Sequence, residues 1–473
     1  MVVRVAIFPF TWLNTQLDSL MGNILLGAIK TYNDKRFLSI FCFGIASGFP
    51  WIMIGSVLSA WLKDDGLSRS AIGLFGIIFA TYSINFLWSP LVDRLKPPIL
   101  GQRKGWIFSM QIGIVACCIA MSQLTTSSHL FYIALVGLFT AIFSATQDIA
   151  IDGFRIDCIA EDDKDGMSAA SSVATAGWWT GYGGLGAIPF FLADLTDWSW
   201  ANIYLLLGVL MGMLAIATLL AKEPDIDRDA LFDRIDSNGT GTGSVDSKAG
   251  VKDKISRWLK STLVSPFSEF FARNGVKLAL SFLLFIFLFK IGEAFLGRMS
   301  IVFYKEIGFT NSDIATYSKL LNWWVTIVFS LLGGIVNIRY GIYRGLMVAG
   351  IAMAASNLLF AVIAQTGPST SLLAFTVIVD GFTGAWSTVA MVAFISLLCN
   401  RAFSATQYAL MASLSVAGRT FVASSSGIVV DSLNGNWSLF FILTAVMVIP
   451  SLVFLYSIRE HIKNVQNPLA PRT

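Results

Sequence analysis

Apolar runs of roughly twenty residues recur along the chain, and no other feature of the sequence restricts its fold so strongly. A helix needs about 20 mostly apolar residues to cross the ~30 Å hydrocarbon core of a bilayer. We predict twelve such runs, near 36–62, 71–91, 106–124, 130–154, 168–193, 200–221, 276–304, 313–336, 344–364, 372–398, 408–430 and 437–458. The chain is therefore expected to be an all-α membrane protein whose main partner is the lipid bilayer.

Composition supports this expectation. Hydrophobic residues make up 55% of the chain and charged residues only 13%, whereas a soluble domain carries about 25% charged residues. Most of the surface must therefore face lipid rather than water. The formal net charge of +4 is too small to indicate a nucleic-acid partner.

The order of the runs predicts two domains. Six runs, a polar stretch and six more runs are the layout of a transporter built from two helical bundles. We expect an N-terminal segment (1–35), a six-helix bundle (36–221), a linker (222–275), a second six-helix bundle (276–458) and a tail (459–473).

The predicted linker contains two patterns. Residues 236–247 begin like a calcium-binding loop, but Ser247 stands where such a loop needs a glutamate, so we interpret them as a flexible linker. Residues 255–272 alternate aromatic and basic side chains, which is typical of an amphipathic helix at the membrane surface.

Basic residues predict the orientation of the chain. Of the 33 Lys and Arg residues, only Lys63, Arg69 and Lys305 fall in the loops opposite to the N-terminal side. Because cytoplasmic loops are enriched in Lys and Arg, we expect both termini to be cytoplasmic.

The segment SATQDIAIDGFRID (144–157) places four charges in or next to the fourth run. Asp148 and Asp152 are four residues apart and share a helix face, and Arg155 falls on the same stripe. A charge in hydrocarbon costs at least ~2.5–3.5 kcal/mol, so these groups must face water or one another. We interpret Asp157, which lies off the stripe, as a surface charge.

Two interpretations of this stripe remain open. A carboxylate that alternates between a wet and a shielded site can carry protons, because shielding favours its neutral form. Alternatively, Asp148, Asp152 and Arg155 form a structural salt bridge between helices.

The second bundle offers a further charged site. Lys290 lies near the middle of its run, where Glu293 can pair with it, and Arg419 lies at a similar depth in the eleventh run. Further amides are expected to hydrogen-bond a polar ligand: Asn85, Gln111, Gln147 and Asn322. Tryptophans could stack on sugar rings or serve only as packing and interfacial residues: Trp178, Trp179, Trp323, Trp324 and Trp386.

The loop DRLKPPILGQRKGW (93–106) suits a conformational latch. Asp93 can sit at a helix terminus or pair with a basic residue of a neighbouring helix. Its candidate members are Asp93, Arg94, Arg103 and Lys104. The alternative is that the basic residues only fix the orientation of the loop.

Other chemistry is not indicated. The five cysteines show no metal-ligand spacing, and no nucleophile–base pattern or phosphate-binding loop is visible. We therefore expect no metal, no cofactor and no enzymatic activity. The glycine-rich stretches 43–51 and 177–189 favour either close helix packing or helix bending.

Several segments together resemble the AmpG-type muropeptide permeases. These segments are FGIASGFP (43–50), FLWSPLVDRLKPP (86–98), GQRKGW (101–106), SATQDIAIDGFRID (144–157), FKIGEAF (289–295) and CNRAFSATQYALMASLSVAGR (399–419). This family belongs to the major facilitator superfamily, in a branch shared with acetyl-coenzyme A transporters. The resemblance implies two six-helix bundles and proton-driven import of GlcNAc-1,6-anhydro-MurNAc and its peptides across the inner membrane for peptidoglycan recycling.

The resemblance also implies roles for individual residues. Asp148, Asp152 and Glu293 would couple protons, and Lys290 and Arg419 would bind substrate. Glu293 stands where the family is expected to have aspartate. We expect a monomer with protons and a small glycan-peptide as its partners. The rival hypotheses are a carrier of another anionic conjugate, such as acetyl-coenzyme A, and a membrane-bound enzyme.

Overall fold

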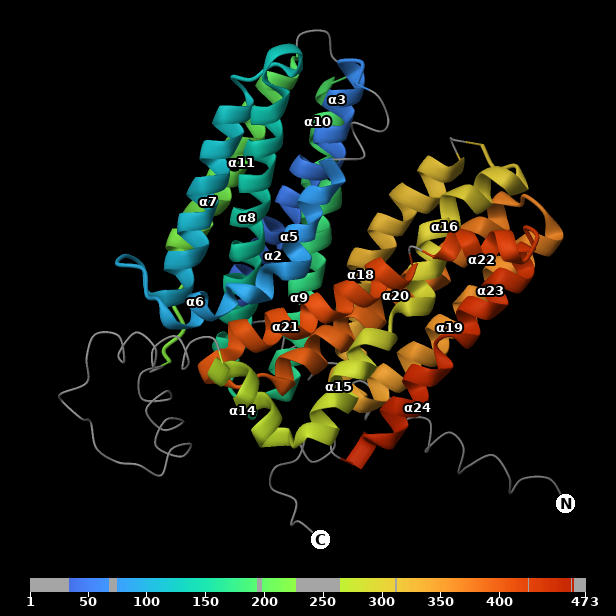
Figure 1. The fold of residues 1–473 in the computed structure, drawn as a ribbon. Coiled ribbons are helices and arrows are strands. Elements are labelled where there is room, and N and C mark those ends of the chain that lie inside the picture. Colours follow the sequence, from blue (N-terminus) through green and yellow to red (C-terminus); the bar gives the residue numbers. More distant parts are fainter. Residues whose placement is uncertain are drawn as a thin grey trace, which may run out of the picture.

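The computed structural model describes residues 34–67, 75–193, 198–226, 264–310, 313–423, 425–460 and 462. Within these residues the secondary structure is entirely helical. The helices form two bundles, one from each half of the chain (Figure 1). The calcium-loop-like stretch at 236–247 lies outside the described residues, as do residues 227–263.

The N-terminal bundle follows the first six predicted runs. Its elements are α2 (Lys35–Ile52), η1 (Met53–Val57) and α3 (Leu58–Asp64); η2 (Gly76–Phe79), α5 (Ala80–Ile84), η3 (Asn85–Leu87) and α6 (Ser89–Arg94); α7 (Gln102–Met121); α8 (Thr126–Cys158); α9 (Lys164–Trp179), η4 (Thr180–Leu185) and α10 (Gly186–Ala193); and α11 (Trp200–Leu220).

The C-terminal bundle follows the last six predicted runs. Its elements are α15 (Val276–Leu288) and α16 (Ile291–Ile307); η6 (Ile314–Leu321) and α18 (Asn322–Tyr340); α19 (Ile342–Thr366); α20 (Thr370–Leu398); η7 (Arg401–Phe403), α21 (Ser404–Ala417), η8 (Gly418–Val422) and α22 (Ser426–Ser432); and α23 (Trp437–Val446) and α24 (Ile449–Ser457).

A short helix, α14 (Ser265–Asn274), leads into the C-terminal bundle and covers part of the predicted amphipathic segment. Phe270 of this helix is buried. Arg273 donates a hydrogen bond to the carbonyl of Leu398 at 2.7 Å. The helix therefore packs against the bundle through its apolar face.

Most of the predicted runs form helices that are long enough to span a membrane. Nine helices in the described part of the chain are long and apolar enough to cross a bilayer. The second, fifth and eleventh runs are helical too, but 3-10 or π-helical turns interrupt them. Helix is therefore found in all twelve predicted ranges, within the residues that the structure describes.

The interruptions occur at related places in the two bundles. The second and eighth runs contain η2, η3 and η6, and the fifth and eleventh runs contain η4 and η8. The first run contains η1, and the seventh breaks at Lys290, whose ψ of 8° is not helical. Helices that leave α geometry at a defined turn can bend there, so both bundles have bending points at matching positions.

The two glycine-rich stretches pack against each other. A Cβ on Gly48 would lie 2.1 Å from the carbonyl oxygen of Trp178, and one on Gly181 would lie 2.2 Å from that of Ile45. Only glycine allows the backbones of α2 and of α9 with η4 to approach so closely. The packing interpretation is therefore confirmed. The π-helical turn η1 follows the first stretch, and the π-helical turn η4 interrupts the second.

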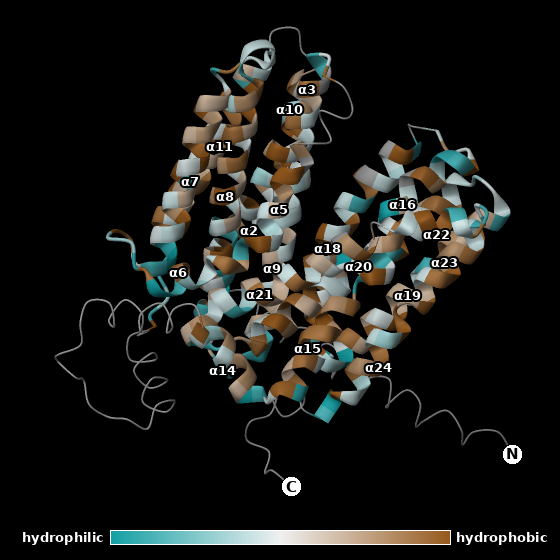
Figure 2. Ribbon diagram, in the orientation of Figure 1, coloured by the Kyte–Doolittle hydropathy of each residue, from teal (hydrophilic) through white to brown (hydrophobic). Residues whose placement is uncertain are grey.

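The bundles touch mainly at one end of the molecule. We call it the basic end, because it carries α14 and the basic segments at 93–106 and 337–345. There α21 contacts α5, α6 and α8, while α9 contacts α18 and α20. The bundles separate toward the opposite end, which carries α3 and α10 (Figure 1). Hydrophilic residues gather at the helix ends and hydrophobic residues along their length (Figure 2).

Candidate functional site

A polar cavity of about 270 Å³ lies in the C-terminal bundle beside the N-terminal bundle. Its walls come from α16, η6, α18 and α20, and the N-terminal bundle contributes Trp179. The residues with hydrogen-bonding groups that line it include Glu293, Ser300, Tyr304, Asn322, Thr326, Asp380 and Thr388. Residues of α16 up to Tyr304 extend the cavity toward the end at which the bundles separate.

The break between α15 and α16 places a cation at the base of this cavity. Lys290 is nearly fully buried, and its ammonium group donates to the carboxylate of Glu293 at 2.5 Å and to the hydroxyl of Thr388 at 2.8 Å. A third hydrogen bond reaches the carbonyl of Gly384 at 3.2 Å. The predicted Lys290–Glu293 pair is therefore present, and the glutamate, 34% exposed, faces the cavity.

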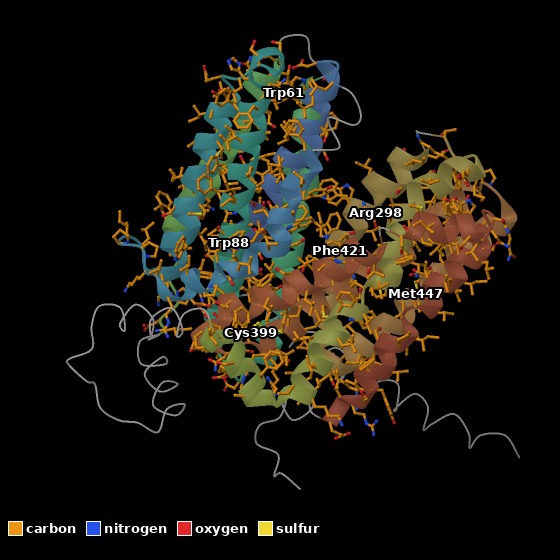
Figure 3. All side chains as sticks on the ribbon, viewed as in Figure 1. Trp61, Trp88, Arg298, Cys399, Phe421 and Met447 are labelled. Atoms are coloured by element: carbon orange, nitrogen blue, oxygen red, sulfur yellow. The ribbon has the colours of Figure 1, made fainter. Side chains whose placement is uncertain are left out.

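Two more charged residues lie close to this pair. Asp380 lines the same cavity and accepts a hydrogen bond from Ser356 at 2.9 Å. Arg419, in η8, is exposed and interacts electrostatically with Glu293. Phe421 of η8 and Arg298 of α16 lie on the side of the C-terminal bundle that faces the N-terminal bundle (Figure 3). Asp380 is not among the predicted site residues, although a carboxylate in an apolar run is a signal for a functional role.

Asp148 is the acid of the charged stripe that forms no ion pair in the described residues. It is partly buried, and its carboxylate lies beside Ser47 and Trp51. Its Oδ1 atom is buried without a hydrogen-bond partner in the described part of the chain. A buried polar atom in this state costs free energy, and a proton on the carboxylate or a bound ligand would lower that cost.

Asp152 and Arg155 form an ion pair at 3.0 Å, one turn from Asp148. Arg155 also donates to the hydroxyl of Ser396 in α20 at 3.2 Å and lies over the ring of Tyr408, 4.9 Å from its centroid. The structural salt bridge is thus formed by two of the three predicted members. Arg155 uses its Nη2 atom and its position over Tyr408 to join the two bundles.

The predicted ligand-binding residues occupy different places. Asn322 lines the cavity. The ring of Trp178 stacks on Tyr182 with centroids 5.0 Å apart, next to the cavity residue Trp179.

Asn85 and Gln147 do not line the cavity in this conformation. Asn85 accepts a hydrogen bond from Ser413 of the other bundle at 2.9 Å. Gln147 is fully buried and donates to the carbonyl of Ala46 at 2.7 Å. Both amides therefore hold helices together in this conformation.

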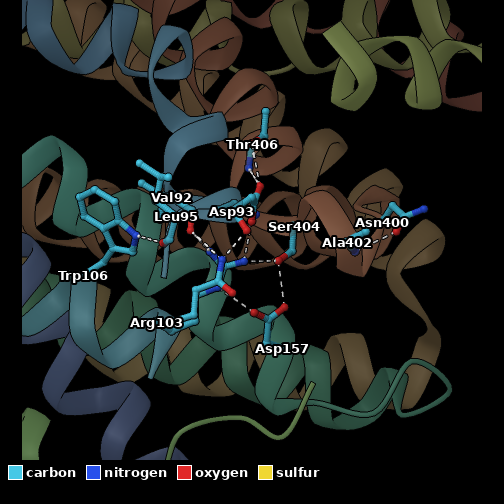
Figure 4. Close-up of polar contacts among 12 residues, drawn as sticks. Val92, Asp93, Leu95, Arg103, Trp106, Asp157, Asn400, Ala402, Ser404 and Thr406 are labelled. Atoms are coloured by element: carbon cyan, nitrogen blue, oxygen red, sulfur yellow. Dashed lines mark hydrogen bonds and ion pairs between the residues drawn. The ribbon is translucent and has the colours of Figure 1, made fainter. Parts of the chain in front are cut away.

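A buried ionic cluster closes the basic end (Figure 4). Arg103 at the start of α7 forms ion pairs with Asp93 at 2.7 Å and with Asp157 at 2.8 Å, and all three side chains are almost fully buried. Its guanidinium also donates to the hydroxyl of Ser404 at 2.8 Å, and that hydroxyl donates to Asp157 at 2.8 Å. Because Ser404 belongs to the other bundle, the cluster joins the two halves of the protein.

Asp93 acts in both ways that its sequence allowed. It pairs with Arg103, and it also caps the N-terminus of α21 by accepting from the backbone NH of Thr406 at 2.8 Å and from its hydroxyl at 2.6 Å. A carboxylate at a helix N-terminus is stabilised by the helix dipole and the free NH groups. The prediction that Asp157 is a surface charge is wrong, because α21 covers it.

The other two predicted latch residues lie around this cluster. Lys104 donates to the carbonyl of Leu219 at 3.1 Å, and Arg94 ends α6. Glu223, which the sequence did not single out, accepts from the backbone NH groups of Arg103 and Lys104 at 2.7 and 2.9 Å. A chain segment after α11 thereby fixes the start of α7.

This arrangement has a consistent chemistry. The basic end is shut by buried ion pairs, whereas the cavity beyond it offers two carboxylates, a nearby paired lysine and arginine, the amide of Asn322 and the indole of Trp179. Such a set suits a polar ligand with charged and ring-shaped parts. No group of three or more His, Cys, Asp or Glu side chains that could hold a metal ion occurs in the described residues.

Comparison with known proteins gives a consistent family. The model of the Major Facilitator Superfamily matches residues 38–321. The chain is 31% identical to the putative transporter AmpG 4 of Rickettsia felis, over 92% of this chain and 99% of the relative. It is 30% identical to the anhydromuropeptide permease of Escherichia coli K12, over 91% of this chain and 81% of the relative.

Solved structures show the same fold. A crystal structure of the major facilitator transporter FucP in the outward conformation matches with a TM-score of 0.63 at 13% identity, over 90% of this chain and 99% of that one. A double tryptophan mutant of XylE matches with a TM-score of 0.64 at 12% identity, over 92% and 98%. At these identities the likeness establishes the architecture of two helical bundles.

Proposed function

The chain belongs to the major facilitator superfamily and, within it, to the AmpG-type permeases, and from this membership we propose that it imports anhydromuropeptides together with protons. It is a multi-pass membrane transporter and not an enzyme. The proposed substrate is GlcNAc-1,6-anhydro-MurNAc with or without its peptide, and the proposed role is peptidoglycan recycling.

The observation that carries the proposal is the polar cavity beside the closed basic end. The peptide carboxylates of a muropeptide would meet Lys290 and Arg419, its amides would meet Asn322, and its sugar rings would pack on Trp178 and Trp179. Rocking would free Asn85 for the substrate, because its partner Ser413 belongs to the other bundle. Gln147 is bonded to Ala46 of its own bundle, so it would reach the substrate only if α8 shifts against α2.

The proposed orientation places the basic end in the cytoplasm and both termini on the same side, in the inner membrane. The structure then corresponds to a state open to the periplasm, with the latch of Asp93, Arg103 and Asp157 shut. Rocking of the bundles around the cavity would break this latch and release substrate inward. A single chain contains both bundles and the cavity, so we propose a monomer.

Proton coupling is proposed for Asp148, with Glu293 and Asp152 as further carboxylates. Asp148 is our first choice because it has no ion-pair partner in the described residues, whereas Asp152 pairs with Arg155 and Glu293 with Lys290. A substrate carboxylate that pairs with Lys290, or a proton on Glu293, would release the glutamate from its lysine.

The test is uptake of radiolabelled anhydromuropeptide into proteoliposomes, with and without an imposed proton gradient. Accumulation that requires the gradient is expected. A coenzyme A thioester, supplied under the same conditions, represents the rival substrate class. Uptake of the thioester but not of the muropeptide would replace the proposed substrate, and gradient-independent accumulation would remove the proton coupling.

A further inference from the structure

The indole of Trp323 lies on two consecutive glycines of the opposite bundle. A Cβ built on Gly183 would stand 2.3 Å from Cδ1 of Trp323, and one on Gly184 would stand 3.1 Å from its Cζ2. The indole NH donates to the carbonyl of Trp179 at 3.1 Å. Close packing and a hydrogen bond therefore hold the ring against the two glycines, an arrangement that we call the seat. The seat requires that residue 183 has no side chain.

Both partners of this contact lie where their helices change geometry. Gly183 and Gly184 belong to the π-helical turn η4, between α9 and α10. Trp323 is the second residue of α18 and follows the π-helical segment η6. Two bending points, one in each bundle, therefore meet directly.

The contact also lies beside the cavity and next to an exposed side chain. Its neighbours Trp179 and Asn322 line the cavity. The next residue, Trp324, is 57% exposed, and its ring centroid is 4.8 Å from that of Trp323. Trp323 thus stands between the cavity residues and an exposed tryptophan.

We propose that Trp323 and the Gly183–Gly184 seat form the fulcrum on which the two bundles rock. The seat keeps the bundles in contact beside the cavity while the end beyond it opens and closes. Trp323 is in this sense a positioning residue for transport. The inference rests on the proposed transport function but not on the identity of the substrate.

The test compares Gly183→Ala, Trp323→Ala and the double variant. Spin labels at cysteines replacing the exposed residues Ser127 and Lys305 report the distance between the open ends of α8 and α16, in a background without the native cysteines. Gly183→Ala overpacks the seat, and we expect it to shift the distance distribution and to lower uptake by about tenfold, equivalent to ~1.4 kcal/mol. Adding Trp323→Ala should return both readouts to those of Trp323→Ala alone.

Gly181→Ala is the matched control, because its Cβ would meet Ile45 within its own bundle. Trp323→Ala should not rescue it. Gly184→Ala, a milder intrusion on the same ring, should shift the distances in the same direction by less than Gly183→Ala. A double variant as impaired as Gly183→Ala alone would overturn the fulcrum. Since the distances are measured without substrate, failure of muropeptide uptake in the unmodified protein would leave this test intact.

Discussion

At the scale of single residues, the charged side chains fall into two groups: those that join the two bundles and those that have no fixed ion pair. Arg103, Asp157 and Arg155 are nearly fully buried, and each bonds to a residue of the other bundle or to a partner that does. Asp148 and Arg419 lack such fixed ion pairs in the described residues. A charge that is already neutralised stabilises one conformation, whereas a charge without a fixed partner is available to a ligand or a proton.

Asp148→Asn should abolish gradient-driven accumulation, because the amide keeps the size of the side chain but cannot carry a proton. Exchange of labelled for unlabelled substrate across the membrane should continue. Both are measured in proteoliposomes as uptake and as counterflow. Asp162→Asn, an exposed residue, is the matched control and should behave as the unmodified protein. Undiminished accumulation by Asp148→Asn would assign the proton to another carboxylate.

Arg419→Gln should raise the KM for an anionic muropeptide by about tenfold, the effect of losing ~1.4 kcal/mol of charge-assisted binding. The KM for the same substrate with its carboxylates amidated should change little. Concentration-dependent initial rates of uptake give both values. Arg298→Gln, at an exposed arginine of α16, controls for loss of a positive charge. An equal effect on both substrates would show that Arg419 does not recognise their carboxylates.

At the scale of elements, the guanidinium of Arg103 holds together the start of α7, the end of α8 and the start of α21. Removing one partner from a buried ion pair costs roughly 3–5 kcal/mol, because the remaining charge is left uncompensated. Arg103→Gln leaves Asp93 and Asp157 together without their cation. The closed basic end therefore depends on this residue more than on any surface pair.

Arg103→Gln is expected to shift the population from the state closed at the basic end toward the opposite state. Spin-label distances between the bundles at that end should lengthen, and the free energy of unfolding should fall by about 3 kcal/mol or more. Arg459→Gln, in an exposed pair with Glu460 at 3.3 Å, should change stability by less than about 1 kcal/mol. Equal effects of both substitutions would mean that the buried cluster stabilises the fold no more than an exposed ion pair does.

At the scale of the whole molecule, the two bundles meet at the basic end, and the side of the membrane that this end faces decides to which side this conformation opens. We expect a cysteine at Lys96, in the exposed basic loop, to react with a membrane-impermeant maleimide only after cells are permeabilised. A cysteine at Ser127, at the opposite end, should react in intact cells. The unmodified chain, whose five cysteines are buried or partly buried, sets the background. The reverse labelling pattern would invert the proposed orientation.

Much of the candidate site could be anticipated residue by residue. The spacing of Lys290 and Glu293 predicted their pairing, and the two roles open to Asp93 are both realised. The loop around Arg103 was identified, but its partners Ser404 and Thr406 were not, because they lie about 300 positions away in the chain. Asp157 was wrongly expected at the surface for the same reason: helix periodicity gives a residue's face but not what covers that face.

The sequence by itself determined the architecture, because an apolar run long enough to cross a bilayer must satisfy its backbone hydrogen bonds as a helix, whatever its neighbours are. The resemblance of local motifs gave the family for a similar reason, since each motif is a short continuous segment. Only the tertiary structure decided which charges meet, where the cavity lies and how Trp323 seats on Gly183. Those contacts depend on the rotation and separation of packed helices, and a few tenths of an ångström between helices is not encoded in any single segment.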